Sequence, residues 1–341
     1  MTGPLRKPTE DIHSATRKPM KTTHSTEEIR HFLQTSKGAD PSSIKSLQEG
    51  HSNQALYFEN RRGDKLVLRI ALGEDDFLHD EYAHEKLHGR LPVPKVLEIG
   101  MFGGDSFYCI SEYIDGVPSD TIKQAEIDSM QPKILNAYAA IFTIDISGSS
   151  GYGPIDLKTD NGEFGSWHEK LACELKRFDA ESVRSHATNI GLDLTLTDKF
   201  IAQATANLPF ASERRRLVHG DLGFDNMLIC NGEVAAFIDW AKISYGDWME
   251  DFANFDFWWP GRHGDKQAFA KQYGLDAEHL EEREALYWAI TALETIRFAD
   301  TFKKQEISQW LHDYVASKLS HRTRSAERKE PAVAHSLVET A

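Results

Sequence analysis

The fold is decided by residues 217–229, which read LVHGDLGFDNMLI. Asp221 and Asn226 lie here between two apolar runs, and a second carboxylate, Asp239, follows a further apolar run. The intervening Asn231-Gly232 pair is a strong hairpin signal, because both residues tolerate positive φ angles. We therefore predict a loop carrying Asp221 and Asn226, then a strand, a hairpin turn and a second strand that delivers Asp239. Two acids and an amide arranged in this way are suited to hold Mg²⁺ and a phosphoryl group while one acid orients a hydroxyl nucleophile.

The composition is ordinary for a globular enzyme and argues against several other classes. The chain has 341 residues, enough for two lobes, with 40% hydrophobic and 27% charged residues. Its net charge of −14 argues against nucleic acid as a partner. We find no apolar run of about 18 residues that would cross a membrane, and no secretory signal. The three cysteines form no CxxC pair, which argues against a zinc site and fits a reducing compartment. We expect a cytoplasmic monomer.

The strand and helix patterns separate the chain into two lobes, which gives an α+β, bilobal fold. Strand signals, turn pairs and one helical pattern (76–88) between residues 40 and 114 predict the order β-β-β-α-β-β. From about residue 117 helical patterns dominate, apart from the predicted hairpin. Helices are predicted over residues 120–146, 166–185, 195–207, 265–273 and 277–319. The predicted boundaries are a disordered extension at 1–24, a β-rich lobe at 25–114, a larger and mainly helical lobe at 115–321, and a disordered tail at 322–341.

The order of the polar residues in the deciding stretch is typical of kinases. His219-x-Asp221-x4-Asn226 followed by Asp239 matches the catalytic loop and metal loop of that class. Together with Gly246-Asp247-x3-Asp251, these motifs make the sequence resemble the aminoglycoside phosphotransferase family over roughly residues 25–320. Within that family, the hygromycin B phosphotransferases look most similar, on the runs at 67–69, 92–100, 108–111, 150–154 and 257–260.

The resemblance implies a protein-kinase-like fold that uses ATP and Mg²⁺ to phosphorylate a hydroxyl of a cationic aminoglycoside antibiotic, with hygromycin B the first candidate. Asp221 would be the catalytic residue that orients the acceptor hydroxyl. Asn226 and Asp239 would bind Mg²⁺. His219, Asp247 and Asp251 would support the catalytic loop.

Nucleotide-binding residues are expected in the β-rich lobe. The turn containing Gly50, Ser52 and Asn53 would cover the ATP phosphates. Arg69 stands where kinases have a lysine on the third strand, and its planar guanidinium can grip phosphate oxygens. Its carboxylate partner is predicted on the following helix, with Glu81 preferred and Asp80 or Glu85 left open. The connector Glu112-Tyr113-Ile114 would pair with adenine through its backbone, which singles out Glu112 and Ile114.

Acceptor-binding residues are expected after Asp239. Residues 244–300 contain 12 acidic and five basic side chains, a balance that would attract a polyamine sugar. Trp258 and Trp259 are candidates to stack on sugar rings, with Trp258 preferred because of the hygromycin-type resemblance. Asp225 is a candidate to contact a substrate amine.

Three other functions are compatible with the fold. The first is the same chemistry on another aminoglycoside, a macrolide or an amino-alcohol metabolite. The second is a nucleotide-binding pseudokinase, which the complete set of Asp221, Asn226 and Asp239 disfavours. A protein kinase is favoured least, because no Asp-Phe-Gly to Ala-Pro-Glu segment follows Asp239.

Overall fold

The computed structural model describes residues 22, 24–47, 53–259 and 264–312 and divides into two compact units. The first unit consists of the described residues up to Ile122 together with Asp225–Lys242. The second consists of Lys123–Phe224 and the described residues from Ile243 onward. The chain therefore passes from the second unit to the first between Phe224 and Asp225, inside the stretch that decides the fold. Almost all of the extension predicted at 1–24, and the tail predicted at 322–341, lie outside the described residues.

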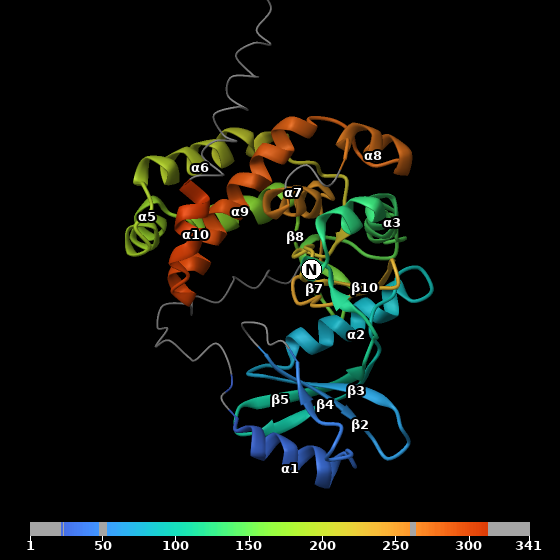
Figure 1. Cartoon of the computed structure of the whole chain (residues 1–341). Coiled ribbons are helices and arrows are strands. Elements are labelled where there is room, and N and C mark those ends of the chain that lie inside the picture. The colour runs from blue at the N-terminus through green and yellow to red at the C-terminus, as the bar shows by residue number, and fades with distance from the viewer. Residues whose placement is uncertain (1–21, 23, 48–52, 260–263, 313–341) are drawn as a thin grey trace, which may run out of the picture. The chain divides into compact units, whose positions relative to one another are not determined.

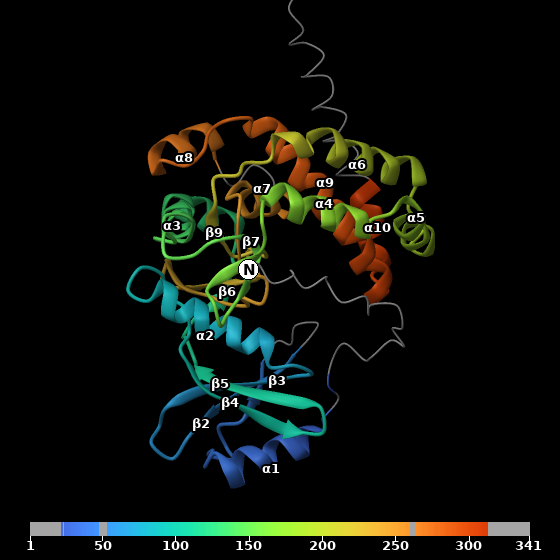
Figure 2. The same cartoon turned by 180° about the vertical axis from the view of Figure 1, so that it is seen from behind.

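The first unit is built on a five-stranded antiparallel sheet with the order β1-β2-β3-β5-β4 (Figure 1). Its strands are β1 (Lys45–Ser46), β2 (Gln54–Glu59), β3 (Lys65–Ala71), β4 (Val96–Gly103) and β5 (Ser106–Glu112). Helices α1 (Thr26–Ser36) and α2 (Asp75–Leu87) cover opposite faces of the sheet (Figures 1 and 2).

Side-chain alternation along β3 decides which residues face which helix. Leu66, Leu68 and Ile70 belong to the hydrophobic cluster that includes α1, whereas Ala71 packs with Phe77 of α2. The odd-numbered positions of β3 therefore face α2, and Arg69 is one of them.

A small three-stranded sheet completes the first unit. Its order is β11-β10-β6, with β6 (Val117–Pro118), β10 (Met227–Cys230) and β11 (Glu233–Phe237), and the short 3-10 helix η1 (Ser119–Thr121) follows β6. The predicted hairpin is thus β10–β11. Although it comes late in the sequence, it packs with the N-terminal part of the chain.

The second unit is mainly helical, with one four-stranded sheet of order β8-β7-β12-β9. Its strands are β7 (Tyr152–Asp156), β8 (Asn161–Phe164), β9 (Arg216–Val218) and β12 (Ser244–Gly246). Its helices are α3 (Gln124–Phe142), α4 (Trp167–Arg177), α5 (Ala180–Asn189), α6 (Leu194–Asn207), η2 (Leu208–Phe210), α7 (Met249–Trp258), α8 (Lys266–Tyr273), α9 (Leu280–Phe302) and α10 (Gln305–Trp310). The long helix α9 packs against α5, α6, α7 and α10 and is buried along most of its length.

The predicted α+β class is confirmed, because strands dominate the first unit and helices the second. None of the helices in the described part of the chain is long and apolar enough to cross a bilayer.

Candidate active site

The β10–β11 hairpin brings Asn226 and Asp239 to the same end. Its two-residue turn is Asn231-Gly232, with φ angles of 51° and 73°, as the sequence predicts. Met227 pairs with Phe237, and the Ile238 N–H donates to the Asn226 carbonyl oxygen at 3.0 Å. Asn226 therefore immediately precedes β10, and Asp239 comes two residues after the end of β11. Both lie at the open end of the hairpin.

Asp239 has a left-handed backbone, with a φ of 64°. This conformation is uncommon for a residue other than glycine, although aspartate tolerates it better than most, and it costs on the order of 1 kcal/mol. The surroundings hold it in place: the Trp240 backbone N–H donates to Asp80 Oδ1 at 3.0 Å, and the buried Trp240 indole N–H donates to the Phe237 carbonyl oxygen at 3.1 Å. Asp239 is an exposed residue.

Arg69 of β3 is paired with Asp80 of α2. Its Nη2 donates to Asp80 Oδ2, and its guanidinium lies over the Phe77 ring, 5.2 Å from the centroid. Burial lowers the pKa of Arg69, but the charge and hydrogen bond of Asp80, together with Cys109 and Asp239, raise it by more, so the net shift is upward. Because the other Asp80 oxygen accepts the Trp240 N–H, this one carboxylate joins the Arg69 cation to the backbone beside Asp239.

The preference for Glu81 as the partner of Arg69 is wrong, and the alternative Asp80 is the partner. The buried face of α2 is formed by Phe77, Asp80, Ala83 and Leu87. Glu81 lies one residue further around the helix and is exposed, as is Glu85. The spacing of Asp80 from the apolar positions on either side was the signal that could have identified it.

The segment after β9 is held by one buried carboxylate. Asp251 Oδ2 accepts the His219 N–H at 2.6 Å, and its Oδ1 accepts the Gly220 N–H at 2.8 Å. Burial raises the pKa of Asp251 to about 8, while these two N–H donors act in the opposite direction. The Asp221 N–H then donates to His219 Nδ1 at 3.3 Å, and the Asp221 side chain is half-buried. His219 and Asp251 thus fix the backbone that presents Asp221.

Asp247 supports the interior of the second unit instead of this loop. Its carboxylate accepts from Arg283 through Nε at 2.8 Å and through Nη2, and from the Tyr287 hydroxyl at 2.9 Å. The backbone N–H groups of Met249 and Ser212 donate to it at 3.0 and 3.3 Å. Asp247 and Arg283 are both fully buried. Any effect of Asp247 on the catalytic loop is therefore indirect.

The adjacent tryptophans Trp258 and Trp259 are both half-buried but have different neighbours. Trp258 stacks on Trp310 of α10, with ring centroids 5.0 Å apart and planes 12° apart. Trp259 meets the Phe224 ring edge to face at 4.8 Å. Asp225, the residue after Phe224, is exposed.

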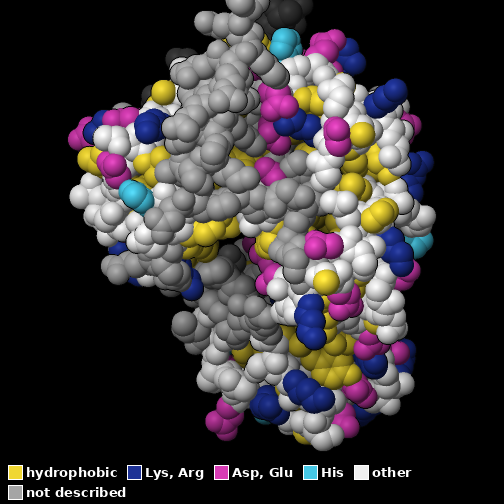
Figure 3. All heavy atoms as spheres, turned by 45° about the horizontal axis from the view of Figure 1, so that its top comes forward, with side chains coloured by type: hydrophobic (Ala, Val, Ile, Leu, Met, Phe, Trp, Pro, Cys, Tyr) yellow, Lys and Arg dark blue, Asp and Glu magenta, His cyan; other side chains and the backbone are white. Residues whose placement is uncertain are grey.

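The acidic excess of residues 244–300 is partly offset by ion pairs with bases from other segments, namely Lys170, Arg214 and Lys303. Among the residues that the structure describes, ion pairs are formed by at least eight of the twelve acidic side chains, namely Asp247, Glu250, Asp276, Glu278, Glu281, Glu284, Glu294 and Asp300. On the face shown in Figure 3, acidic and basic side chains are intermixed. The segment therefore remains acidic, although it carries less unpaired negative charge than its composition predicts.

The predicted nucleotide contacts are only partly visible. Gly50 and Ser52 lie outside the described residues, and Asn53 is half-buried. In the connector, the Glu112 N–H donates to the Lys95 carbonyl at 3.0 Å, and the Tyr113 N–H donates to the Lys65 carbonyl at 3.1 Å. The N–H groups of Glu112 and Tyr113 are therefore already bonded within the protein. Of the three connector residues, Ile114 is the one whose backbone N–H is still a candidate to donate to adenine.

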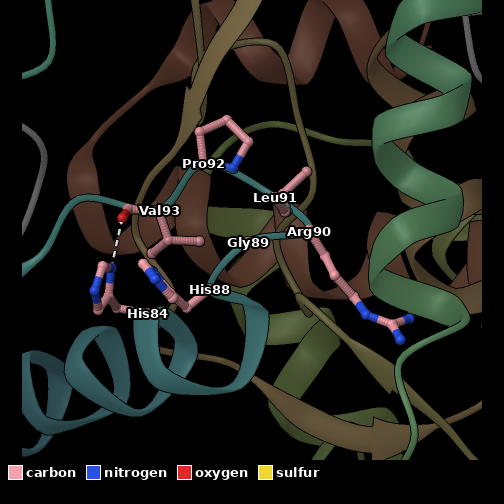
Figure 4. Close-up of a pocket in the computed structure, with 7 residues that line it drawn as sticks. All are labelled: His84, His88, Gly89, Arg90, Leu91, Pro92 and Val93. Atoms are coloured by element: carbon pink, nitrogen blue, oxygen red, sulfur yellow. Dashed lines mark hydrogen bonds between the residues drawn. The ribbon is translucent and has the colours of Figure 1, made fainter.

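A pocket of about 310 Å³ opens at the C-terminal end of α2 (Figure 4). It is lined by His84, His88, Gly89, Arg90, Leu91, Pro92 and Val93. The two imidazoles lie side by side with centroids 5.3 Å apart, and His84 Nδ1 donates to the Val93 carbonyl at 2.8 Å, whereas Arg90 points away from them. None of the predicted site residues lines this pocket, so it does not bear on the predicted chemistry.

Comparison with known proteins points to one group of enzymes. Residues 43–288 match the phosphotransferase enzyme family. The chain is 32% identical over 224 residues to the hygromycin-B 4-O-kinase of Escherichia coli, a match that spans 64% of this chain and 63% of that enzyme.

The solved structures of aminoglycoside phosphotransferases have the same fold as this chain. A thermostable mutant of APH(4)-Ia, in a ternary complex with AMP-PNP and hygromycin B, superimposes with a TM-score of 0.71 at 24% identity, covering 87% of this chain and 98% of that one. The GDP and kanamycin complex of an APH(2") enzyme gives a TM-score of 0.59 at 15% identity, covering 88% and 99%. These likenesses confirm the predicted kinase-like fold.

Proposed function

The chain belongs to the phosphotransferase enzyme family, and on that basis we propose that it transfers the γ-phosphoryl group of ATP to a hydroxyl group of an aminoglycoside or aminocyclitol antibiotic. Hygromycin B is the first candidate acceptor, because the curated relative acts on it. The observation that supports this proposal most directly is the position of Asn226 and Asp239 at the open end of one hairpin, next to the Arg69–Asp80 pair.

In this proposal the first unit binds the nucleotide. Asn226 and Asp239 offer the amide and carboxylate oxygens that Mg²⁺ prefers, and the bound ion would neutralise charge on the phosphates. Arg69 remains a cation, held by Asp80, and presents its remaining N–H donors to a phosphate oxygen. Asp80 in turn fixes Trp240, which keeps the left-handed Asp239 backbone in one conformation.

The second unit supplies Asp221. Its carboxylate would orient the acceptor hydroxyl toward the γ-phosphate and take the hydroxyl proton as the new P–O bond forms and the bond from the γ-phosphorus to the bridging oxygen breaks, with ADP as the leaving group. The backbone N–H groups of His219 and Gly220, which donate to Asp251, fix the position of the backbone from which the Asp221 side chain extends. Catalysis of this kind depends mainly on positioning and charge, so the rigidity of that loop matters.

The assignment of a cationic acceptor rests on similarity more than on the charge of residues 244–300, because most of those acids are paired. Asp225, exposed and adjacent to Asn226, is the acid that we propose meets an ammonium group of the acceptor.

A screen for ADP release across aminoglycosides, macrolides and small amino alcohols tests the proposal. We expect Mg²⁺-dependent turnover with hygromycin B and little or none with macrolides. Activity confined to amino alcohols would reassign the acceptor, and silence with every aminoglycoside would refute the proposal.

The bridging role of Asp80 predicts graded losses on substitution. Asp80→Asn keeps an oxygen for the Trp240 N–H but loses the ion pair with Arg69, so kcat/KM should fall about tenfold. Asp80→Ala loses both contacts, so its kcat/KM should fall about a hundredfold or more. Steady-state kinetics at varied Mg²⁺ would measure both. Glu81→Gln, on the exposed face of the same helix, is the control and should stay near wild type. Equal losses in Glu81→Gln and Asp80→Asn would contradict this assignment.

A further inference from the structure

Helix α7 runs along the catalytic loop and contacts it in sequence order. Near its N-terminal end Asp251 holds His219 and Gly220. One turn later, Asn254 Nδ2 donates to the Leu222 carbonyl at 3.5 Å. The contacts advance together along the helix and the loop, so the C-terminal end of α7 lies beside the last residues of the loop.

Three aromatic rings form the final contact of this series. Phe224 meets Phe255 and Trp259 edge to face, each at 4.8 Å and 74°. Phe224 and Phe255 are only 1% exposed, whereas Trp259 is half-buried. Trp259 is therefore the solvent-accessible member of the cluster, and its ring packs on the residue that lies three positions after Asp221 and directly before Asp225.

Trp258 belongs to a different cluster. One face of its ring stacks on Trp310. Phe257 meets Trp258 and Trp310 edge to face, with ring centroids 5.1 and 5.2 Å apart. Phe257 in turn meets Trp288 of α9 at 5.2 Å. These contacts attach α10 to α7 and α9, which is a structural role for Trp258.

We infer that Trp259, and not the preferred Trp258, is the specificity-determining aromatic residue of the acceptor site, and that its indole packs against the sugar ring that carries the acceptor hydroxyl. This inference rests on the proposed function. The ring is anchored on one side by Phe224, so its position is coupled to the loop that presents Asp221. An indole fixed in this way offers a flat apolar surface to the C–H face of a sugar, and it also attracts a nearby ammonium group.

The test compares Trp259→Ala, Trp259→Phe and the matched control Trp258→Ala, each assayed beside wild type for KM of hygromycin B, KM of ATP, kcat and thermal stability. We expect Trp259→Ala to raise the acceptor KM about tenfold or more while the ATP KM stays within about twofold. Trp259→Phe keeps a ring against Phe224 and should give an intermediate acceptor KM. Trp258→Ala should lower the melting temperature but change the acceptor KM less than about threefold.

Each outcome decides between the alternatives. An unchanged acceptor KM in Trp259→Ala, or a larger change in Trp258→Ala, would overturn the inference. Equal increases in the acceptor and ATP KM values would also overturn it, because they would indicate a purely structural role for Trp259. Failure of the wild-type protein to phosphorylate any aminoglycoside would instead refute the proposed function, and the inference with it.

Discussion

Replacing Asp221 with alanine is expected to lower kcat by at least about a hundredfold while leaving ATP affinity within about twofold of wild type. In the proposed reaction Asp221 acts on the acceptor hydroxyl, whereas Arg69, Asn226 and Asp239 bind the nucleotide. The substitution should therefore remove an interaction made in the transition state without disturbing the ground-state complex with ATP. Coupled ADP-release kinetics would measure kcat, and calorimetry with a non-hydrolysable ATP analogue would measure nucleotide affinity.

Asp225→Ala provides the matched control, because Asp225 is exposed and four residues further along the same loop. We expect it to raise the acceptor KM and to change kcat much less. If Asp221→Ala kept more than about a tenth of the wild-type rate, the barrier would have risen by less than ~1.4 kcal/mol, and the role given to Asp221 would be wrong.

Replacing Asp247 with asparagine is expected to reduce the free energy of unfolding by about 3–5 kcal/mol. The substitution removes the directly hydrogen-bonded carboxylate from the fully buried Arg283 guanidinium, which keeps only Asp276 at 3.7 Å as an anionic partner among the described residues. It also weakens the bonds from Tyr287 and from two backbone N–H groups. A poorly compensated buried charge costs far more than the pair contributes. Thermal denaturation followed by circular dichroism should show a fall of roughly 6–20 °C in melting temperature.

Two further variants separate this mechanism from a general sensitivity of α9. Glu281→Gln breaks the pair with Lys266, in which Glu281 is 68% exposed, and should change stability by less than about 1 kcal/mol. Adding Arg283→Met to Asp247→Asn removes the poorly compensated buried charge and should recover part of the lost stability. A double variant that is less stable than Asp247→Asn alone would contradict the explanation.

Elements with strong local signals could be predicted from the sequence. Ser25 caps α1 by accepting the Glu28 N–H at 3.2 Å, as the Ser-x-x-Glu pattern predicts. The Asn231-Gly232 turn and the strands of the first sheet likewise follow from turn chemistry and alternation, which depend on near neighbours in the sequence.

Elements set by tertiary contacts were harder to predict. The helix predicted at 166–185 is two helices, because Asp179 caps α5 by accepting the Ser182 N–H. The helix predicted at 277–319 breaks at Lys303, whose φ is 56°. Helix α7 was missed altogether. It is buried on most of its surface, so its sequence lacks the alternation of polar and apolar residues that reveals a surface helix.

The same distinction explains the site. Asp221, Asn226 and Asp239 are close together in the sequence, separated only by a short loop and a hairpin. Their spacing therefore forms a motif that can be recognised from the sequence alone. The pairing of Arg69 with Asp80 depends on which face of α2 is buried, and the link from Asp80 to Trp240 spans 160 positions. The charge of residues 244–300 depends on bases that come from other segments. Sequence spacing does not determine such contacts.

The left-handed backbone of Asp239 also limits how this protein can lose its activity by genetic drift. At a φ of 64°, glycine fits without strain, and asparagine and aspartate fit better than most other residues. Both alternatives are one nucleotide change away from either aspartate codon. Descendants that lose the chemistry but keep the full stability of the fold should therefore carry asparagine or glycine at this position more often than other residues, which would add backbone strain of about 1 kcal/mol or more.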